Sequence, residues 1–431
     1  MKRAFKLIFL VGLLFMACPA YCGEYYEFVS KWGSYGSGDG EFIPMGVATD
    51  GEGNVYVADV VNHRIQKFDS NGSFTSMWGK EGSGNGDFLL PSGIATDKEG
   101  NIYVVDSGNH RIQKFTKDGV FITKWGLGGT ESGQFIWPIG IATDDEGNVY
   151  VADGNMYFID VDEGNNRIQK FTKNGVFITM WGKKGSGNGE FNAPSGIATD
   201  NEGNIYVVDT GNQRIQKFTK DGAFITKWGK SGTESGQFIC PMGIATDDEG
   251  NVYVADGNLY FIDVDKINHH IQKFTTDGTF TTKWGRKGSG DGEFIWPSGI
   301  TIDNKGNIYV VDIGNHRIQK FRMIIIPMSS PTKEIPVYPN PFKAYSLYNH
   351  NKITFGDRRD TDKMLPEEGI IKIYNVAGEL IKTMGVNLAD GGRKEWDVKN
   401  EEGEPLAAGV YIYIITNLAG EKTAGRIGIV K

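Results

Sequence analysis

Two nearly identical segments hold the residues of this chain that are best suited to binding chemistry. Each is a nine-residue insertion with two aromatic residues followed by two aspartates: Tyr157, Phe158, Asp160 and Asp162 in the first, and Tyr260, Phe261, Asp263 and Asp265 in the second. Aromatic faces suit sugars or apolar peptide side chains. Paired carboxylates offer oxygen ligands to Ca²⁺, although their spacing is not that of an EF-hand loop. We interpret the segments as walls of a binding cleft; the alternative is a lengthened hairpin with solvated carboxylates.

A third group of candidate residues precedes a proline that recurs along the chain. The position varies among the copies, and its occupants are Leu90, Trp137, Ala193, Cys240 and Trp296, with Ile43 nearest to it in the first copy. Such variation is expected of a residue that contacts a ligand, and equally of one that drifts in a half-buried loop. Because their rings could stack on a ligand, Trp137 and Trp296 join the predicted binding residues.

The other reactive residue types indicate no catalytic or metal site. Four histidines share one position of a repeated tripeptide: His63, His110, His269 and His316. Zinc ligands must all come within about 2.1 Å of one ion, which equivalent positions in separate repeats cannot do, so we expect a structural turn role. Cys240 has no histidine partner in a nucleophile motif. We assign no catalytic residue, resident metal or cofactor.

A sequence repeat positions these residues. The glycine that opens each segment of type G-I-A-T-D recurs at steps of 47 or 56 residues, at Gly46, Gly93, Gly140, Gly196, Gly243 and Gly299. Each copy holds four β-type segments separated by Gly, Asp and Asn turns, which in the second copy are residues 93–96, 102–105, 111–115 and 120–125. Six such units predict an all-β fold that begins with a six-bladed β-propeller over residues 24–325.

The two ends of the repeat array complement each other. The last copy stops after its third segment, at Phe321, while residues 26–33 match the missing fourth segment. We expect these ends to pair, because closure removes the open edges of the array. In four copies we expect the arginine of the tripeptide to pair with the aspartate ending the second segment: Arg111 with Asp106, Arg64 with Asp59, Arg214 with Asp209 and Arg317 with Asp312.

The repeat resembles the NHL family over residues 25–325. The resemblance is carried by Asn62-His63-Arg64, Asn109-His110-Arg111 and Asn315-His316-Arg317, together with the recurring G-I-A-T-D, R-I-Q-K-F and W-G elements. It implies a six-bladed propeller that binds proteins, glycans or RNA, with a minority of lyases. Asn166, Gln213 and His270 depart from the family tripeptide.

A second domain follows a proline-punctuated linker at residues 326–336. Alternating apolar segments with glycine turns predict a small immunoglobulin-like β-sandwich over residues 337–431. The motifs P-N-P-F, I-Y-N-V-A-G-E-L and G-V-Y-I-Y resemble the FlgD-type immunoglobulin-like domain and the C-terminal sorting domain of type IX secretion substrates. That resemblance implies contact with outer-membrane secretion machinery and display at the cell surface; the alternative is a plain spacer.

The N-terminus and the net charge narrow the partners. Residues 1–22 have the basic start, apolar run and small residues of a secretory signal peptide, and we expect no transmembrane span in the mature chain. Removal of Lys2, Arg3 and Lys6 takes the net charge from −8 to −11, which opposes binding to nucleic acid. Cys240 is then the sole cysteine, so no intrachain disulfide is expected.

These observations favour a secreted or surface-displayed, non-enzymatic protein whose propeller recognises an extracellular protein or polysaccharide. The alternative is a metal-assisted lyase resembling the amidating or streptogramin lyases. Such an enzyme needs a general base and a metal near the channel, and no His or Glu departs from the repeat to supply them.

Overall fold

The computed structural model describes most of the first three quarters of the chain and parts of the remainder. The described residues are 21–154, 164–257, 268–327, 337–338, 342–343, 353–355, 369–375, 380–387, 394–397, 399–406, 409–417 and 422–430. The chain divides into two compact units, one formed by Tyr25–Ile324 and the other mainly by residues after it. None of the helices in the described stretches has the length and apolar character needed to cross a membrane.

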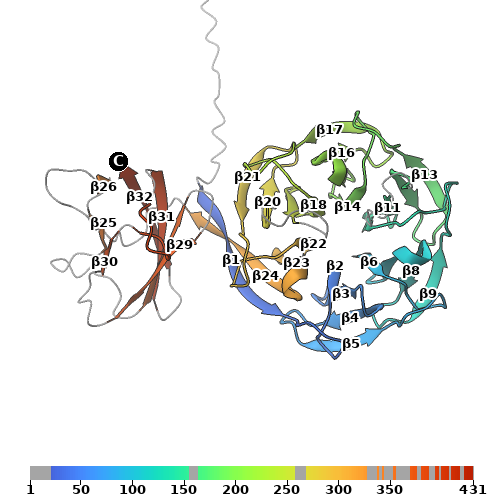
Figure 1. Cartoon of the computed structure of the whole chain (residues 1–431), viewed down its shortest axis with the longest axis horizontal. Helices are drawn as coiled ribbons and strands as arrows, with labels where there is room; N and C mark the ends of the chain where they lie inside the picture. The colour runs from blue at the N-terminus through green and yellow to red at the C-terminus, as the bar shows by residue number, and fades with distance from the viewer. Residues whose placement is uncertain are drawn as a thin grey trace, which may run out of the picture. The chain divides into compact units, whose positions relative to one another are not determined.

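Six four-stranded antiparallel sheets, counted over the described residues, form a ring in the first unit (Figure 1). We call them blades 1 to 6 and their strands A to D from the centre outward. Blade 1 holds β2 (Pro44–Thr49), β3 (Val55–Asp59), β4 (Arg64–Phe68) and β5 (Phe74–Trp78). Blade 2 holds β6 (Pro91–Thr96), β7 (Ile102–Asp106), β8 (Arg111–Phe115) and β9 (Phe121–Trp125). Blade 3 holds β10 (Gly140–Thr143), β11 (Val149–Asp153), β12 (Arg167–Phe171) and β13 (Phe177–Trp181).

The second half of the ring repeats the pattern. Blade 4 holds β14 (Pro194–Thr199), β15 (Ile205–Asp209), β16 (Arg214–Phe218) and β17 (Phe224–Trp228). Blade 5 holds β18 (Pro241–Thr246), β19 (Val252–Asp256), β20 (His270–Phe274) and β21 (Phe280–Trp284). Blade 6 holds β22 (Pro297–Ile302), β23 (Asn307–Asp312), β24 (Arg317–Pro327) and β1 (Tyr21–Trp32). Short 3₁₀ turns join strands B and C in blades 2, 4 and 6: η1 (Ser107–Asn109), η2 (Thr210–Asn212) and η4 (Ile313–Asn315).

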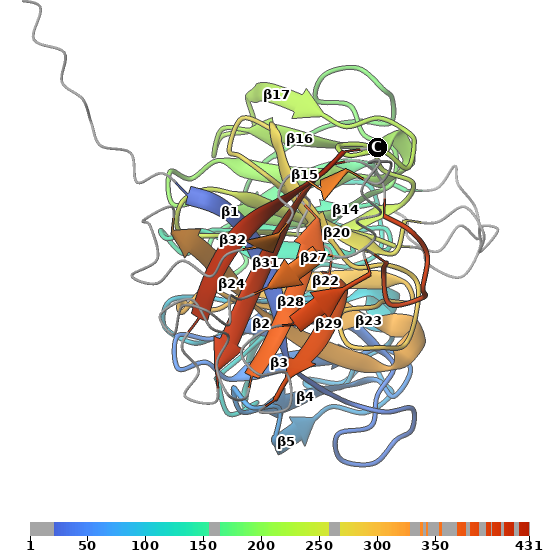
Figure 2. The same ribbon diagram turned by 90° about the vertical axis from the view of Figure 1, so that its left-hand side faces the viewer.

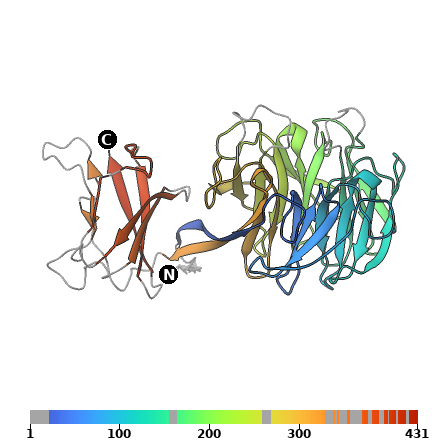
Figure 3. The same ribbon diagram turned by 60° about the horizontal axis from the view of Figure 1, so that its bottom comes forward.

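The predicted closure of the ring is confirmed. Strand β1 from the start of the chain pairs with β24 and completes blade 6, as the side view in Figure 3 also shows. Tyr26 of β1 stacks on Trp284 of blade 5, with ring centroids 3.9 Å apart. Strand β24 continues to Pro327, past the predicted end of the propeller at residue 325.

Burial explains why these segments form blades. In blades 1 to 5, strands B and C are buried at every position because each blade is packed between two others. In blades 1 to 4, strand D alternates between half-buried and exposed residues on the outer surface. The A strands approach one another closely at their glycines. A Cβ atom on Gly196 would lie 2.4 Å from the carbonyl oxygen of Met242 in the next blade. Only glycine permits that approach.

The second unit contains two sheets in its described residues. One has the order β25 (Val337–Tyr338), β27 (Ile353–Phe355), β30 (Lys394–Trp396). The other has the order β26 (Phe342–Lys343), β32 (Lys422–Val430), β31 (Gly409–Asn417), β28 (Gly369–Asn375), β29 (Leu380–Val386). Strands β28, β29, β31 and β32 can be followed in Figure 2. The two sheets share one core, in which Phe355 packs against Tyr413 and Trp396 is buried.

Candidate functional site

The face of the propeller that carries the B–C turns, here called the top face, also carries the connections between blades. Successive strands of a blade run antiparallel, so these loops lie together, while the A–B and C–D turns lie on the opposite bottom face. Strand B ends at Asp153 in blade 3 and at Asp256 in blade 5, where the two insertions begin. Both insertions therefore start from the top face.

Each B–C turn clamps the connection that leads into its own blade. In blade 2 the buried Asp106 carboxylate accepts hydrogen bonds from Asn109 Nδ2 at 2.9 and 3.0 Å and pairs with Arg111 Nε at 2.7 Å. The Arg111 guanidinium also donates to three backbone carbonyl oxygens of residues 83–87, at 2.7 to 2.9 Å. The repeated Asn-His-Arg tripeptide is thus a structural clamp, here called the arginine clamp.

The predicted pairing of arginine with aspartate is confirmed. The distance from Arg Nε to Asp Oδ2 is 2.7 to 3.0 Å in five blades, for Arg64 and Asp59, Arg111 and Asp106, Arg167 and Asp153, Arg214 and Asp209, and Arg317 and Asp312. Burial raises the pKa of Asp106 above its ordinary value, and the N–H donors that surround the carboxylate, Arg111 among them, oppose that rise. The buried charge is tolerated because it is paired.

The middle residue of the tripeptide links neighbouring blades. Histidine Nδ1 accepts a backbone N–H from the next blade at 3.0 to 3.2 Å, in the pairs His63 with Leu90, His110 with Trp137, and His269 with Trp296. The Asn166 side-chain oxygen accepts the N–H of Ala193 in the same way, at 2.8 Å. The structural role predicted for the histidines is confirmed at these three positions.

The residues that donate these N–H groups have left-handed backbone. Their φ angles are 52° at Leu90, 50° at Trp137, 49° at Ala193 and 58° at Trp296. This conformation costs a non-glycine residue roughly 1–2 kcal/mol, so the bond from the preceding blade holds it in place. The result is a row of fixed positions with differing side chains.

The structure places both predicted tryptophans on the top face, but in opposite blades. Trp137 of blade 3 is half-buried and meets the His110 ring edge-on, at a centroid distance of 5.3 Å. Trp296 of blade 6 is half-buried and packs on the apolar cluster at the channel together with Leu90 and Ile239. The two indoles therefore flank the channel mouth and do not form a single platform.

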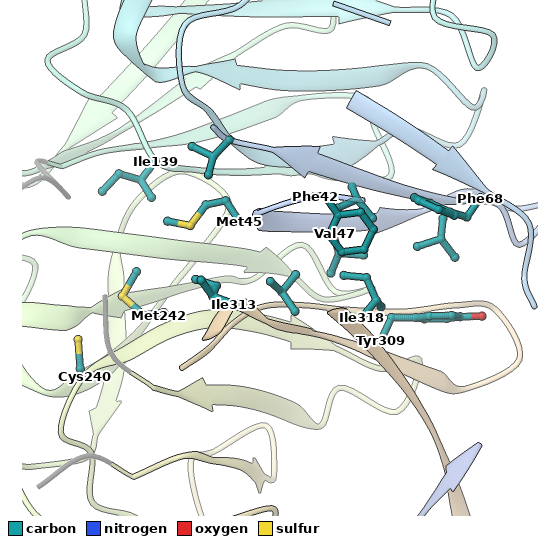
Figure 4. Packing of buried hydrophobic residues seen from close by; sticks show 14 residues of the cluster. Phe42, Met45, Val47, Phe68, Ile139, Cys240, Met242, Tyr309, Ile313 and Ile318 are labelled. Atoms are coloured by element: carbon teal, nitrogen blue, oxygen red, sulfur yellow. The ribbon is translucent and has the colours of Figure 1, made fainter. Parts of the chain in front are cut away.

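Apolar side chains close the channel beneath this mouth. Around the A strands Met45, Ile139 and Met242 alternate with Ser92, Ser195 and Ser298. Each serine hydroxyl donates to the carbonyl oxygen of the following apolar residue, at 3.0 to 3.1 Å. Figure 4 shows Met45, Ile139 and Met242 together with Cys240, which belongs to the same apolar cluster. The remaining cavity of about 90 Å³ has room for a few water molecules but not for a larger ligand.

Two of the six junctions lack the bond between blades among the described residues. Gln213 Nε2 donates to carbonyl oxygens of its own turn, and the facing Cys240 N–H turns to Asp256 instead. Between blades 6 and 1 the connection is one residue shorter, so His316 Nδ1 has no described partner and its ring packs against Tyr35. Both features, Gln213 in place of histidine and the shorter connection, are present in the sequence. They could not be interpreted there, because the hydrogen bond from histidine to the next blade was not predicted.

Blade 5 also lacks the arginine clamp, because His270 replaces the arginine. His270 Nε2 lies 3.8 Å from Asp256 Oδ2, beyond hydrogen-bonding distance, and has no other partner among the described residues. Asp256 accepts hydrogen bonds from Cys240 N–H and Asn268 Nδ2. Burial raises the pKa of Asp256 to about 7 and lowers the pKa of His270 to about 3. Both groups are therefore neutral inside the folded blade at slightly acidic pH.

The predicted cleft walls and calcium ligands lie outside the described residues: Tyr157, Phe158, Asp160, Asp162, Tyr260, Phe261, Asp263 and Asp265. Their roles stay predictions. The described residues contain no group of three or more His, Cys, Asp or Glu side chains that could hold a metal ion. Asn165 and Asn268, which follow the insertions, bind Asp153 and Asp256 at 2.9 and 2.8 Å. Each insertion thus begins after a buried aspartate and ends before the asparagine that binds it.

Two protein-family models match the chain. The NHL repeat model matches residues 43–68, 88–115 and 191–218, and a model described as a 6-bladed beta-propeller matches residues 245–372. The chain therefore contains NHL repeats built into a six-bladed β-propeller.

Curated relatives match short stretches only. The chain is 51% identical over 45 residues to the B-box type zinc finger protein ncl-1 of Caenorhabditis elegans, which is 10% of this chain and 5% of that protein. It is 35% identical over 66 residues to the human NHL repeat-containing protein 3, which is 15% of this chain and 19% of that protein. The chain thus spans less than a fifth of the length of these relatives.

Solved structures share the fold at low sequence identity. A Bacteroides thetaiotaomicron protein of unknown function has a TM-score of 0.51 at 18% identity, covering 70% of this chain and 76% of that one. A Xanthomonas campestris gluconolactonase has 0.47 at 14%, covering 65% and 86%, and a Staphylococcus aureus virginiamycin B lyase has 0.45 at 16%, covering 69% and 100%. These likenesses concern the fold alone. They nevertheless correct one expectation: the exclusion of enzymatic activity was wrong, because enzymes are among the proteins that share this fold.

Proposed function

We propose that the top face of the propeller binds an extracellular protein or polysaccharide. The observation that carries the proposal is the row of left-handed, non-glycine residues at the channel mouth, φ 49° to 58°, each held by a side chain of the preceding blade. Backbone strain of this kind clusters at ligand-contacting sites. Here the left-handed conformation occurs at four equivalent positions whose side chains differ, and two of these side chains are tryptophan.

The surroundings support a large ligand. Half-buried apolar residues of four blades, Ile43, Leu90, Ile239 and Trp296, pack on the cluster that closes the channel. A closed channel gives a ligand a floor, and loops on a rigid scaffold are where binding residues concentrate. The proposal assigns the side walls of this site to the two insertions, which follow Asp153 of blade 3 and Asp256 of blade 5.

Removal of the insertions tests this proposal. Deleting residues 155–163 and 258–266 restores turns of the length found in blades 2, 4 and 6 and keeps Asn165 and Asn268, which bind the buried Asp153 and Asp256. We expect the shortened protein to keep its circular dichroism spectrum and thermal midpoint but to lose binding to extracellular polysaccharides or envelope proteins. If the folded double deletion binds the ligand as well as the native chain does, the insertions are not part of the binding site. Analysis of the ligand for chemical change after incubation with the native chain shows whether the protein also has enzymatic activity.

We further propose that the second unit is an immunoglobulin-like domain that sorts or attaches a secreted chain. The motifs at residues 339–342, 373–380 and 409–413 support it, as does a core shared by two sheets. A reporter protein fused to residues 326–431 and expressed in a bacterium with type IX secretion should reach the cell surface. A reporter that stays inside the cell envelope makes the domain a spacer.

A further inference from the structure

On the bottom face, the C–D turn of each of blades 1 to 5 closes the junction with the preceding blade. Between blades 1 and 2 the carbonyl oxygen of Lys117 accepts a hydrogen bond from the buried Lys67 Nζ at 3.1 Å. The ammonium of Lys117 pairs with Glu52 of the A–B turn at 2.7 Å. One turn residue therefore contributes a carbonyl oxygen to the interior and a positive charge to the rim.

The same contact recurs at the other junctions where a C–D turn is present. A buried lysine donates to a turn carbonyl oxygen at 2.9 to 3.3 Å, in the pairs Lys114 with Lys173, Lys170 with Lys220, Lys217 with Thr276, and Lys320 with Ser70. Between blades 3 and 4 the rim ion pair recurs as well, from Lys220 Nζ to Glu146 at 2.9 Å.

The junction between blades 5 and 6 is open, because blade 6 has no C–D turn. Its C strand continues through Met323, and its D strand comes from the start of the chain. Tyr26 occupies the place over Trp284 that a turn glycine takes at the other junctions, such as Gly119 over Trp78. A cavity of about 470 Å³ remains, lined from the A–B turns near the channel to Tyr253, Ile308 and Met323.

The charges in this cavity are uneven. Its acidic lining residues are Asp50, Asp97, Asp247, Asp248, Glu249 and Asp303, and its basic lining residue is Lys98, which pairs with Asp145 at 2.9 Å. Asp247 is bound within the propeller, for example by the Tyr253 hydroxyl at 2.9 Å. Asp248 and Glu249 are exposed and form no ion pair in the described part of the chain. Glu249 has the position in its blade that Glu52 and Glu146 have in theirs.

We propose that this open junction docks a lysine-bearing β-turn of a partner protein. The lysine ammonium pairs with Glu249, as Lys117 pairs with Glu52, and the turn fills the cavity beside Tyr253 and Met323. The five other junctions of the same chain define this occupant, because a turn closes each of them on the bottom face. Here Tyr26 takes the place of the turn glycine only and leaves the cavity beside it. The site lies on the bottom face and does not depend on ligand binding at the top face.

A peptide copied from the chain tests the proposal. The probe is residues 115–121, Phe-Thr-Lys-Asp-Gly-Val-Phe, capped at both ends and carrying a fluorophore; its matched control has glutamate in place of the lysine. Fluorescence anisotropy with the full chain should show saturable binding of the lysine peptide and roughly tenfold weaker binding of the control.

Variants of the protein locate the site. Asp248→Asn combined with Glu249→Gln should weaken binding of the lysine peptide roughly tenfold. Glu202→Gln, an exposed glutamate at the junction that Thr276 closes, should leave it unchanged. The proposal is overturned if the two peptides bind equally, if neither binds, or if the two protein variants have equal effects. It is also overturned if Nα-acetyl-lysine amide, which keeps the side-chain amine but forms no turn, competes as well as the peptide. In that case the site recognises an amine and not a turn.

Discussion

Exchange of the clamp residues between blades 4 and 5 should move the stability of the propeller in opposite directions. Arg214 pairs with buried Asp209 at 2.7 Å and donates to three carbonyl oxygens at 2.6 to 2.9 Å. Arg214→His leaves that carboxylate without its cation, and breaking a buried pair from one side costs about 3–5 kcal/mol. His270→Arg gives Asp256 the missing cation and should add about 1.5–3 kcal/mol, the range for hydrogen bonds to a charged group.

Urea unfolding followed by tryptophan fluorescence measures both changes, because eight of the nine tryptophans lie in the propeller. The second unit is monitored separately by circular dichroism, since two units need not unfold together. Arg286→His is the matched control: Arg286 pairs with Glu293 at an exposed site, so its loss should cost less than about 1 kcal/mol. The clamp reasoning is refuted if Arg214→His costs no more than this control, or if His270→Arg lowers the free energy of unfolding.

Two further predictions concern packing and pH. Gly196→Ala places a Cβ atom 2.4 Å from the Met242 carbonyl oxygen and should lower the free energy of unfolding by about 1–3 kcal/mol, whereas Gly51→Ala, with no atom within 4 Å, should be close to neutral in the same titration; equal effects contradict the close approach of the A strands. The pKa of Asp256 is raised to about 7, so this group contributes stability below pH 4 that is lost as the pH rises through 7. The pKa of His270 is lowered to about 3, so this group contributes stability above pH 6.5 that is lost as the pH falls. His270→Ala removes the second contribution, so its stability relative to the native chain should fall by about 1.5 kcal/mol between pH 5 and pH 6.5. A difference that does not change with pH, in urea midpoints at these two values, rejects burial as the cause.

The blades were predictable because the same pattern of β-type segments and turns recurs six times in the sequence. The segments expected at residues 102–105 and 111–115 agree with β7 and β8 within one residue, and alternation with glycine turns was the signal. Ring closure was predictable because the pattern was missing at Phe321 and present near Tyr26. Local pattern and edge pairing together determine this part of the fold.

Contacts between blades were not predictable in the same way. The Trp137 N–H donates to His110, 27 residues earlier and in another blade, and no local pattern encodes that bond. The cavity between blades 5 and 6 results from the path of β24 and from the stacking of Tyr26 on Trp284. The missing turn in the sequence did not indicate either of these. The expectation of a non-enzymatic protein failed because it rested on the absence of an unusual His or Glu, whereas proteins with this fold include enzymes.

A binding comparison tests most directly the claim that the top face recognises a ligand. The native chain and a Trp137→Ala, Trp296→Ala double variant are applied to one array of extracellular polysaccharides and purified envelope proteins. The matched control is Ile122→Ala combined with Ile225→Ala, at exposed positions on outer D strands. Top-face recognition predicts a ligand that the native chain and the control variant retain equally and that the tryptophan variant loses by tenfold or more, the scale of losing two aromatic anchors. Equal retention by all three proteins contradicts it.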